Sequence, residues 1–348
     1  MFENTTAAVF RLSALGDIVL TTGVLDYWHK KRGLSFVFIT RPGPAEILRG
    51  HPAIRQIITL DKPELTGRAW FDRAGELART LTNMPLIDLH GTLRSRILAL
   101  RWQGPVRRYP KFGLKRRLFN RLGWQSLRSK LEQTCVTQRY ALALEPTPPP
   151  PSALLPHIAL DTGEAAAGIL RLLTAAGTTL TDTPRIVALH PYATHPAKAW
   201  PRDSWIELAS LLSQAGLAWI VIGRDTAPLF PGDQRDFTNQ TDLRQTCALL
   251  RASDTLVTND SGPMHLAAGV GTPVVALFGP TARVWGFYPQ GERDRVLERD
   301  MDCRPCSLHG SNQCPQDRAC LTGITPNEAL EAALSTLPEA VEQTSPQP

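Results

Sequence analysis

The stretch 257–281 constrains the fold of this 348-residue chain more than any other. A β-branched run at 254–258 leads into the polar turn Asn259-Asp260-Ser261-Gly262, and Pro263 stands where a short helix would begin. A second apolar run follows at 273–278. This order predicts a strand, a turn, a helix and another strand, which is the repeating unit of an α/β protein.

The turn in the middle of this unit is suited to bind an anion. Ser261 or Gly262 is placed to cap the helix, and Pro263 fits a first turn whose backbone N–H groups lack partners. Those N–H groups and the positive end of the helix dipole attract a phosphate, and Gly262 lets the ligand approach the backbone. The alternative is a capped helix of an ordinary α/β domain that binds no ligand there.

Apolar strands alternate with helices along both halves of the chain, which indicates βαβ units and largely parallel sheets. We expect strands at 7–12, 36–40, 54–60, 86–89, 185–190, 217–222, 254–258 and 273–278. The proline-rich segment 146–151 separates the halves as a stiff connector. The prediction is an α/β fold of two Rossmann-like domains, 1–155 and 156–338, facing across a ligand-binding cleft, with a disordered tail at 339–348.

Basic residues are concentrated in one part of the chain. The net charge is +6, but the stretch from Arg94 to Lys130 holds twelve lysines and arginines and no acidic residue. Such a local field informs on the partners of a protein rather than on its fold. It suits nucleic acid, an anionic membrane surface or an acidic substrate, and the alternative is a solvated, partly disordered segment.

No segment reaches the roughly 18 uninterrupted apolar residues of a membrane span, and the N-terminus lacks a signal-peptide pattern, so we expect a cytoplasmic protein. Four of the six cysteines cluster around His309, and these are Cys303, Cys306, Cys314 and Cys320. Their spacing allows a zinc site, a disulfide or free thiols packed in a loop. We expect no metal in the functional site itself.

The turn from Ser13 to Asp17 follows the first strand and carries candidate catalytic chemistry. Gly16 permits close approach of a substrate. Asp17 is either the N-cap of the next helix or a carboxylate that takes a proton from a hydroxyl nucleophile.

The loop from His190 to Pro201 follows another strand and places Thr194 and Lys198 near the same edge of the sheet. The lysine is either a phosphate contact or a solvated surface residue. Asp225 after the next strand is a weak candidate for a ribose hydroxyl contact. The chain has neither GxGxxG nor a Walker A lysine, which disfavours those nucleotide sites.

Three motifs resemble glycosyltransferase family nine, the heptosyltransferases of lipopolysaccharide core assembly. In chain order they are RLSALGDIVLTTGVL, HPYATHPAKAWPRDSW and NDSGPMHLAAGVGTPVVALFGPT. The segment Cys320-Leu321-Thr322-Gly323-Ile324 also resembles many members. The resemblance covers most of the chain, whereas the basic and proline-rich middle lies outside the shared motifs.

The resemblance implies a GT-B-type glycosyltransferase with Asp17 as the catalytic base and ADP-heptose bound mainly by the C-terminal domain. The donor-binding residues it implies, together with the loop residues above, are Thr194, Lys198, Asp225, Asp260, Ser261, Gly262, Met264 and His265. For the acceptor we expect Ser13, Gly16, Arg94, Arg116 and Arg117.

We therefore expect an inverting, metal-independent glycosyltransferase that needs no cofactor. It would move heptose from ADP-L-glycero-D-manno-heptose to an anionic acceptor of the lipid A–Kdo type, in peripheral contact with the inner membrane. One alternative is a sugar-nucleotide epimerase or hydrolase on the same scaffold. A nucleic-acid-binding protein is disfavoured, because the basic segment has few aromatic residues and the rest of the chain is acidic.

Overall fold

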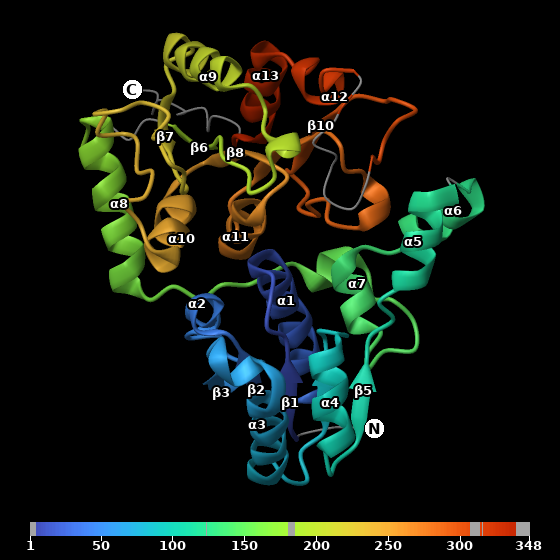
Figure 1. The fold of residues 1–348 in the computed structure, drawn as a ribbon. Coiled ribbons are helices and arrows are strands. Elements are labelled where there is room, and N and C mark those ends of the chain that lie inside the picture. Colours follow the sequence, from blue (N-terminus) through green and yellow to red (C-terminus); the bar gives the residue numbers. More distant parts are fainter. Residues whose placement is uncertain (1–4, 123, 180–184, 307–313, 315, 339–348) are drawn as a thin grey trace, which may run out of the picture.

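The computed structural model describes residues 5–122, 124–179, 185–306, 314 and 316–338. It contains two five-stranded parallel sheets, one from each half of the chain, with helices on both faces of each (Figure 1). The predicted α/β class with two Rossmann-like units is confirmed. The predicted boundary near 155 stays a prediction, and the tail at 339–348 and His309 lie outside the described residues.

The first sheet has the strand order β3-β2-β1-β4-β5. Its strands are β1 (Thr6–Phe10), β2 (Ser35–Thr40), β3 (Ile54–Thr59), β4 (Leu86–Asp88) and β5 (Val106–Arg108). Successive side chains of β1 enter different cores, since Val9 packs under α1 (Leu15–Arg32) and α7 (Val136–Ala141). Phe10 packs under α3 (Gly67–Thr80) and α4 (Leu93–Arg101) on the other face.

The second sheet has the order β10-β9-β8-β6-β7. Its strands are β6 (Ile186–His190), β7 (Ala218–Val221), β8 (Thr255–Asn259), β9 (Val274–Phe278) and β10 (Arg295–Glu298). One face is covered by α8 (Thr162–Ala176), α10 (Leu243–Ala252) and α11 (Gly262–Val270). The other face is covered by α9 (Arg202–Gln214) and α13 (Pro326–Thr336).

Shorter elements connect these layers. They are α2 (Pro42–Ala45), α5 (Gly113–Leu122), α6 (Gln125–Glu132), α12 (Ala319–Thr322) and the 3₁₀ turns η1 (Glu46–Leu48), η2 (Pro63–Leu65), η3 (Pro151–Leu154), η4 (Pro196–Lys198) and η5 (Arg283–Trp285). None of the described helices is both long and apolar enough to cross a bilayer.

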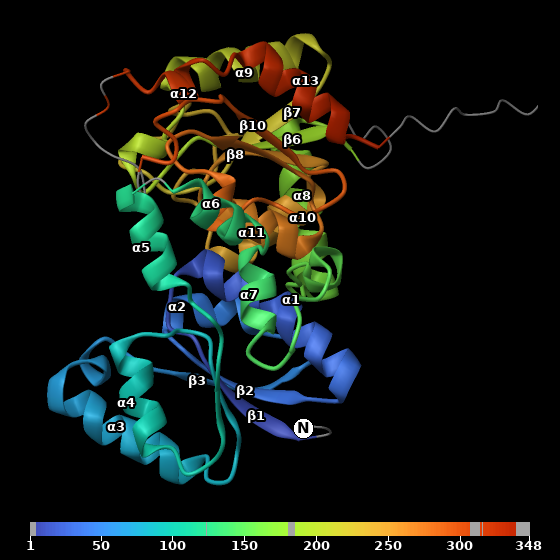
Figure 2. The same ribbon diagram turned by 90° about the vertical axis from the view of Figure 1, so that its right-hand side faces the viewer.

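The basic segment is ordered into α4, β5, α5 and α6, so the alternative of a partly disordered segment is wrong for its described residues. The reason is tertiary packing. Phe119 of α5 and Leu131 of α6 are buried in one cluster with Trp285, and the Phe119 and Trp285 rings meet edge to face at 5.9 Å. The segment therefore extends from the first half of the chain and docks on the second (Figure 2).

Both sheets place their functional turns where the strand order reverses. In the first sheet the order reverses beside β1, and the Ser13–Asp17 turn follows that strand. In the second it reverses between β6 and β8, which end at His190 and Asn259. Crevices at such switch points are the usual ligand sites of parallel sheets.

The two halves share a buried core where α1 packs on α11, and the two helices meet at the centre of Figure 1. Val19 of α1 belongs to the same apolar cluster as Met264 of α11 and Ile158 of the connector. The amide of Ile158 donates to the carbonyl of Gly269 at 2.7 Å. A Cβ at Gly269 would stand 2.6 Å from the Ile158 side chain, so only glycine allows this approach.

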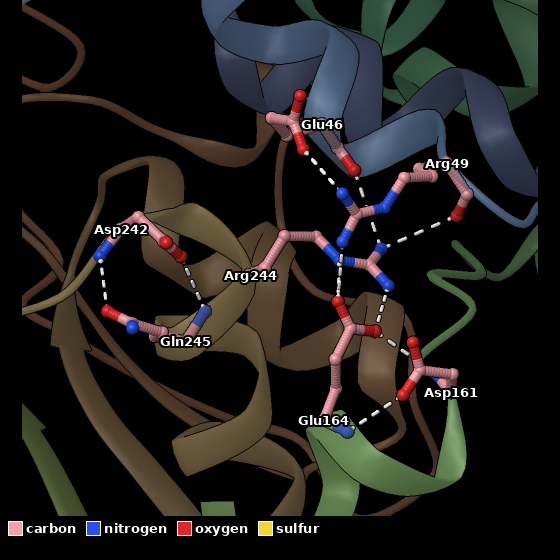
Figure 3. A network of polar contacts seen from close by, with 7 residues as sticks. All are labelled: Glu46, Arg49, Asp161, Glu164, Asp242, Arg244 and Gln245. Carbon is pink, nitrogen blue, oxygen red and sulfur yellow. Dashed lines mark hydrogen bonds and ion pairs between the residues drawn. The ribbon is translucent and has the colours of Figure 1, made fainter. Parts of the chain in front are cut away.

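A second contact between the halves is polar and centres on Glu164 (Figure 3). Its carboxylate accepts hydrogen bonds from Arg244 Nε at 2.9 Å and from Arg49 Nη2 at 2.7 Å. Arg244 also donates to the carbonyls of Glu46 and Arg49, each at 3.4 Å. The network thus ties η1 of the first half to α8 and α10 of the second.

The two arginines, with the Asp161 amide, lower the pKa of Glu164 to about 2, although partial burial opposes the shift. A depressed folded-state pKa stabilises the protein above the unfolded value of 4.5, and this stability is lost as pH falls toward 2.

We predict that Glu164→Gln lowers the free energy of unfolding at pH 7 by about 1–2 kcal/mol, because two charge-assisted hydrogen bonds weaken. The difference from the wild type should shrink steadily below pH 4.5. Urea unfolding at a series of pH values measures it. Glu76→Gln is the control, because Glu76 is an exposed residue that pairs with Arg73 on the surface of α3. A deficit that does not change with pH would contradict the electrostatic origin.

Candidate functional site

A cavity of about 960 Å³ lies between the two halves. The first half contributes the turn 14–17. The second half contributes the ends of β6, β8 and β9 and the loops behind them, which include His190, Thr194, Lys198, Arg224, Asp225, Thr241, Thr246, Asp260, Ser261, Gly262, His265, Thr281, Trp285 and Phe287. Acidic, basic and apolar groups from distant parts of the sequence therefore meet in one space.

Asp17 is the acidic group of the first half. It is the third residue of α1, so the interpretation of Asp17 as the N-cap of this helix is wrong. Ala14 occupies the N-cap position, and its amide donates to Asp17 Oδ2 at 3.2 Å. A carboxylate in the first turn also interacts favourably with the helix dipole.

Two side chains from outside the turn hold the Asp17 carboxylate. Arg11 Nη2 lies 2.5 Å from Oδ2, and the Tyr140 hydroxyl donates to Oδ1 at 2.5 Å. Burial by itself would raise the pKa of Asp17, but Arg11, Tyr140 and the Ala14 amide outweigh it and lower this pKa below its usual value. The carboxylate is therefore charged, and ready to accept a proton, at neutral pH.

Gly16 brings this carboxylate close to the second half. A Cβ at Gly16 would stand 2.5 Å from Cδ2 of the His265 ring, so a larger residue would push the halves apart. The His265 ring is buried, which lowers its pKa, and the charges of Asp260, Asp17 and Lys198 all act on it. His265 thus lies between the acid of the first half and the ion pair of the second.

The N-terminus of α11 lines one side of the cavity. Ser261 is the N-cap as predicted, but its hydroxyl makes no capping bond and instead lies 3.1 Å from Nδ1 of His190. Burial lowers the pKa of His190 to about 4, so this ring is neutral. The first-turn amides of α11 therefore have no side-chain cap and stay available to an anion.

Lys198 brings a positive charge to the same place. Its Nζ lies 2.6 Å from Asp260 Oδ2, which also accepts a hydrogen bond from the Thr281 hydroxyl at 2.7 Å. The alternative of a solvated surface lysine is wrong, because the Lys198 side chain is 16% exposed. The Lys198 ammonium could instead bind a phosphate, but its contact with Asp260 would then be broken and the Asp260 carboxylate would lose this partner.

Another part of the cavity carries polar groups that could contact a nucleoside. It is lined by 223–226, 241–243 and Thr246, from the loops after β7 and before α10. Asp225 is exposed here and Asn239 Nδ2 donates to its backbone carbonyl at 2.7 Å. Its carboxylate accepts from the Thr226 amide at 2.6 Å and remains accessible to a hydroxyl.

Some predicted residues lie elsewhere. Ser13 precedes the lining turn, and Met264 points into the core under α11 with no exposed surface, so its side chain does not line the cavity. Arg94 lies outside the cavity and donates to the Leu65 carbonyl at 2.8 Å. Arg117 is exposed on α5. The acceptor roles of Ser13, Arg94 and Arg117 find no support in these positions.

Arg116 is closer to the site. Its Nη2 donates to the carbonyl of the cavity residue Trp285 at 2.9 Å. Burial lowers the pKa of Arg116 and that of Lys111, and Arg11 further lowers the pKa of Lys111. Arg11, Lys111 and Arg116 thus all interact with Asp17, and Lys111 also interacts with Asp88, so the cations outnumber the carboxylates on this side of the cavity.

Sequence reasoning missed Arg11, Tyr140 and His190 as site residues. Arg11 had a local signal, because it is a charged residue at the end of a buried apolar strand. Tyr140 had none, since it reaches Asp17 from a helix 123 residues further along the chain.

All six cysteines are free thiols in the structure, and Cys320 is buried. No group of three or more histidine, cysteine or acidic side chains within the described ranges is arranged to hold a metal ion. The disulfide alternative for Cys303, Cys306, Cys314 and Cys320 therefore has no support here.

Two parallel α/β units that share a cleft form a GT-B-type architecture. The chain matches the model of glycosyltransferase family 9 (heptosyltransferase) over residues 75–315, and it belongs to that family. The predicted family is confirmed. The matched region begins after the Asp17 turn.

Individual relatives agree with this assignment. The chain is 30% identical over 172 residues to lipooligosaccharide heptosyltransferase 2 of Haemophilus influenzae, covering 44% of this chain and about half (49%) of that protein. It is 26% identical over 322 residues to lipopolysaccharide heptosyltransferase 1 of Pseudomonas aeruginosa, covering 85% and 84%. The structure of Escherichia coli ADP-heptose heptosyltransferase II shares the fold, with a TM-score of 0.71, 20% identity and coverage of 95% and 98%.

We predict that Tyr140→Phe shifts the acid limb of kcat/KM toward higher pH. The substitution removes a donor to the charged form of Asp17, so the pKa of this carboxyl rises, and activity is lost at a higher pH as the carboxylate is protonated. Tyr27→Phe, at a tyrosine that contacts Lys31 far from the cavity, is the control. An unchanged pH profile would mean that Tyr140 does not tune Asp17.

Proposed function

We propose that the protein is an inverting heptosyltransferase. It moves heptose from ADP-L-glycero-D-manno-heptose to a hydroxyl of an anionic lipopolysaccharide core acceptor. Family membership supports the reaction class. The observation that carries the mechanism is the meeting of a charged Asp17 with the uncapped N-terminus of α11 and Lys198 in one cavity.

The residues that line the cavity support a position for the donor. Its nucleoside occupies the end near Asp225 and Thr246, and its diphosphate lies between Thr194, Lys198 and the first turn of α11. Amides at a helix N-terminus and a lysine are a well-suited cradle for this group. The sugar then extends past His265 toward Asp17, which lies at the other side of the cleft.

In the transfer step Asp17 takes the proton of the acceptor hydroxyl as its oxygen bonds to the anomeric carbon. The bond from that carbon to the diphosphate breaks, and ADP leaves with the negative charge. Attack from the face opposite the leaving group inverts the anomeric configuration. Lys198 and the α11 amides stabilise the departing diphosphate electrostatically.

The acceptor enters from the first half. The positive field of Arg11, Lys111 and Arg116 favours a phosphorylated or carboxylated sugar of the lipid A–Kdo type. We place the reaction on the cytoplasmic side, in peripheral contact with the inner membrane from which such an acceptor projects.

Asp17→Asn should lower kcat by about two to four orders of magnitude, because the amide cannot accept the proton. ADP affinity should change less than about threefold, since the base acts on the acceptor and not on the donor. Product formation from ADP-heptose and a core acceptor, with calorimetry for ADP, measures both. Near-normal turnover would remove Asp17 from the chemistry. Release of free or epimerised sugar without acceptor would replace the transferase with the hydrolase or epimerase alternative.

Lys198→Ala should weaken ADP binding by roughly 1.5–3 kcal/mol, through loss of one charge-assisted contact to phosphate. Lys30→Ala is the control, because Lys30 is a surface lysine, 73% exposed, that pairs with Asp26. Calorimetric titration of both variants with ADP tests the assignment. Equal affinities would place the diphosphate away from Lys198.

A further inference from the structure

Exposed apolar side chains and unopposed positive charge coincide on the first half of the molecule. Among the described residues, six large apolar side chains are at least 50% exposed, namely Phe71, Leu93, Leu100, Leu114, Trp124 and Leu170. Four of them, Leu93, Leu100, Leu114 and Trp124, lie in or directly beside the acid-free stretch 94–130. Exposed leucines are common singly, but their concentration among cations points to a binding surface.

Helix α4 shows the pattern most clearly. Leu93 and Leu100 are seven residues apart, which places them on one helix face, and they are 74% and 86% exposed. Arg96 is exposed between them, while Leu98 is fully buried against the sheet. The helix contains no acidic residue.

Helix α5 repeats the pattern. Leu114 is 72% exposed and is followed by exposed Lys115 and Arg117. Phe119 and Arg116 of the same helix turn toward Trp285, which lines the cavity. Helices α4 and α5 lie along the same side of the molecule, at the left in Figure 2. The surface therefore adjoins the acceptor side of the site.

Two of the positive charges on this surface have no polar partner in the described part of the fold, whereas Lys115 Nζ lies 4.8 Å from the centre of the Phe112 ring. The guanidinium groups of Arg96 and Arg117 make no polar contact within the part of the chain that the structure describes. By contrast, Arg94 bonds the Leu65 carbonyl and Arg101 stacks 4.1 Å from the Phe71 ring. Arg96 and Arg117 are thus free to bind an external anion.

We propose that the α4–α5 surface, defined by Leu93, Arg96, Leu100, Leu114, Lys115 and Arg117, binds an anionic phospholipid bilayer. The leucines enter the headgroup–acyl boundary and the cations contact lipid phosphates, as on amphipathic interfacial helices. The leucines stand apart on two helices among charges, which suits a fluid lipid surface better than the contiguous apolar centre of a protein interface. The proposal extends the proposed function, because it brings the cavity to the layer that holds a lipid-linked acceptor.

Sedimentation of the full chain with vesicles tests the surface. We expect binding to mixed phosphatidylglycerol–phosphatidylcholine vesicles that weakens as salt rises, and little binding to pure phosphatidylcholine. Leu93→Ser/Leu100→Ser should weaken the binding about tenfold or more, and Arg96→Glu/Arg117→Glu should weaken it at least as much. Leu170→Ser, at a leucine 68% exposed on α8 and outside the acid-free stretch, should bind like the wild type.

Two results would overturn the proposal: no binding of the wild type to the anionic vesicles at low salt, or binding that neither double variant reduces. ADP affinity and transfer to a water-soluble acceptor without acyl chains are measured on the same variants. Both should stay at wild-type values if the surface acts on membranes. Failure of the wild type in those two assays would instead count against the proposed function, whatever the vesicles show.

Discussion

The packing of α1 against α11 is the contact on which the rest of the site depends. Val19, Ile158 and Met264 form one core across the two halves, and that core fixes how the first turns of both helices meet. Gly16 then approaches the His265 ring so closely that no larger residue would fit. A carboxylate from one half and an anion-binding helix end from the other are thereby held within one cavity, which neither half could form alone.

The cavity contains two carboxylates, Asp17 and Asp260, each paired with a cation. Arg11 and Tyr140 keep Asp17 ionised, which weakens it as a base but keeps it ready at neutral pH. A weak base is sufficient when the hydroxyl becomes more acidic as its oxygen bonds to carbon. Asp260 instead pairs with Lys198 and neutralises its charge. Burial alone would favour the protonated form of Asp17, but Arg11 and Tyr140 outweigh it and lower its pKa.

Local sequence pattern predicted eight of the ten described strands, because parallel strands covered on both faces read as continuous apolar runs such as 274–278. It missed β5 and β10, because these edge strands are only partly buried and their sequences are not continuously apolar. The positions of Asp17 and Lys198 at the cavity were predictable, because Asp17 lies in the first turn of the helix that follows such a strand and Lys198 lies between such a strand and the next helix. The burial of Met264 in the core was not predictable. Helix α11 is apolar on nearly all sides, so its sequence does not reveal which residues face the cleft. The role of Tyr140 and the internal bonds of Arg94 and Arg116 depend on tertiary contacts between distant segments, which carry no local signal.

The Lys198–Asp260 pair also bears on how a catalytic cycle would end. Asp260 acts as a built-in competitor, because every phosphate that takes the Lys198 ammonium must displace it. The Asp260 charge thus offsets part of the attraction between Lys198 and a diphosphate. The same carboxylate can recapture the lysine once the sugar has gone and help to expel the nucleotide. In the proposed reaction the pair would therefore lower the affinity for ADP in favour of faster release, and it would limit inhibition by this nucleotide product.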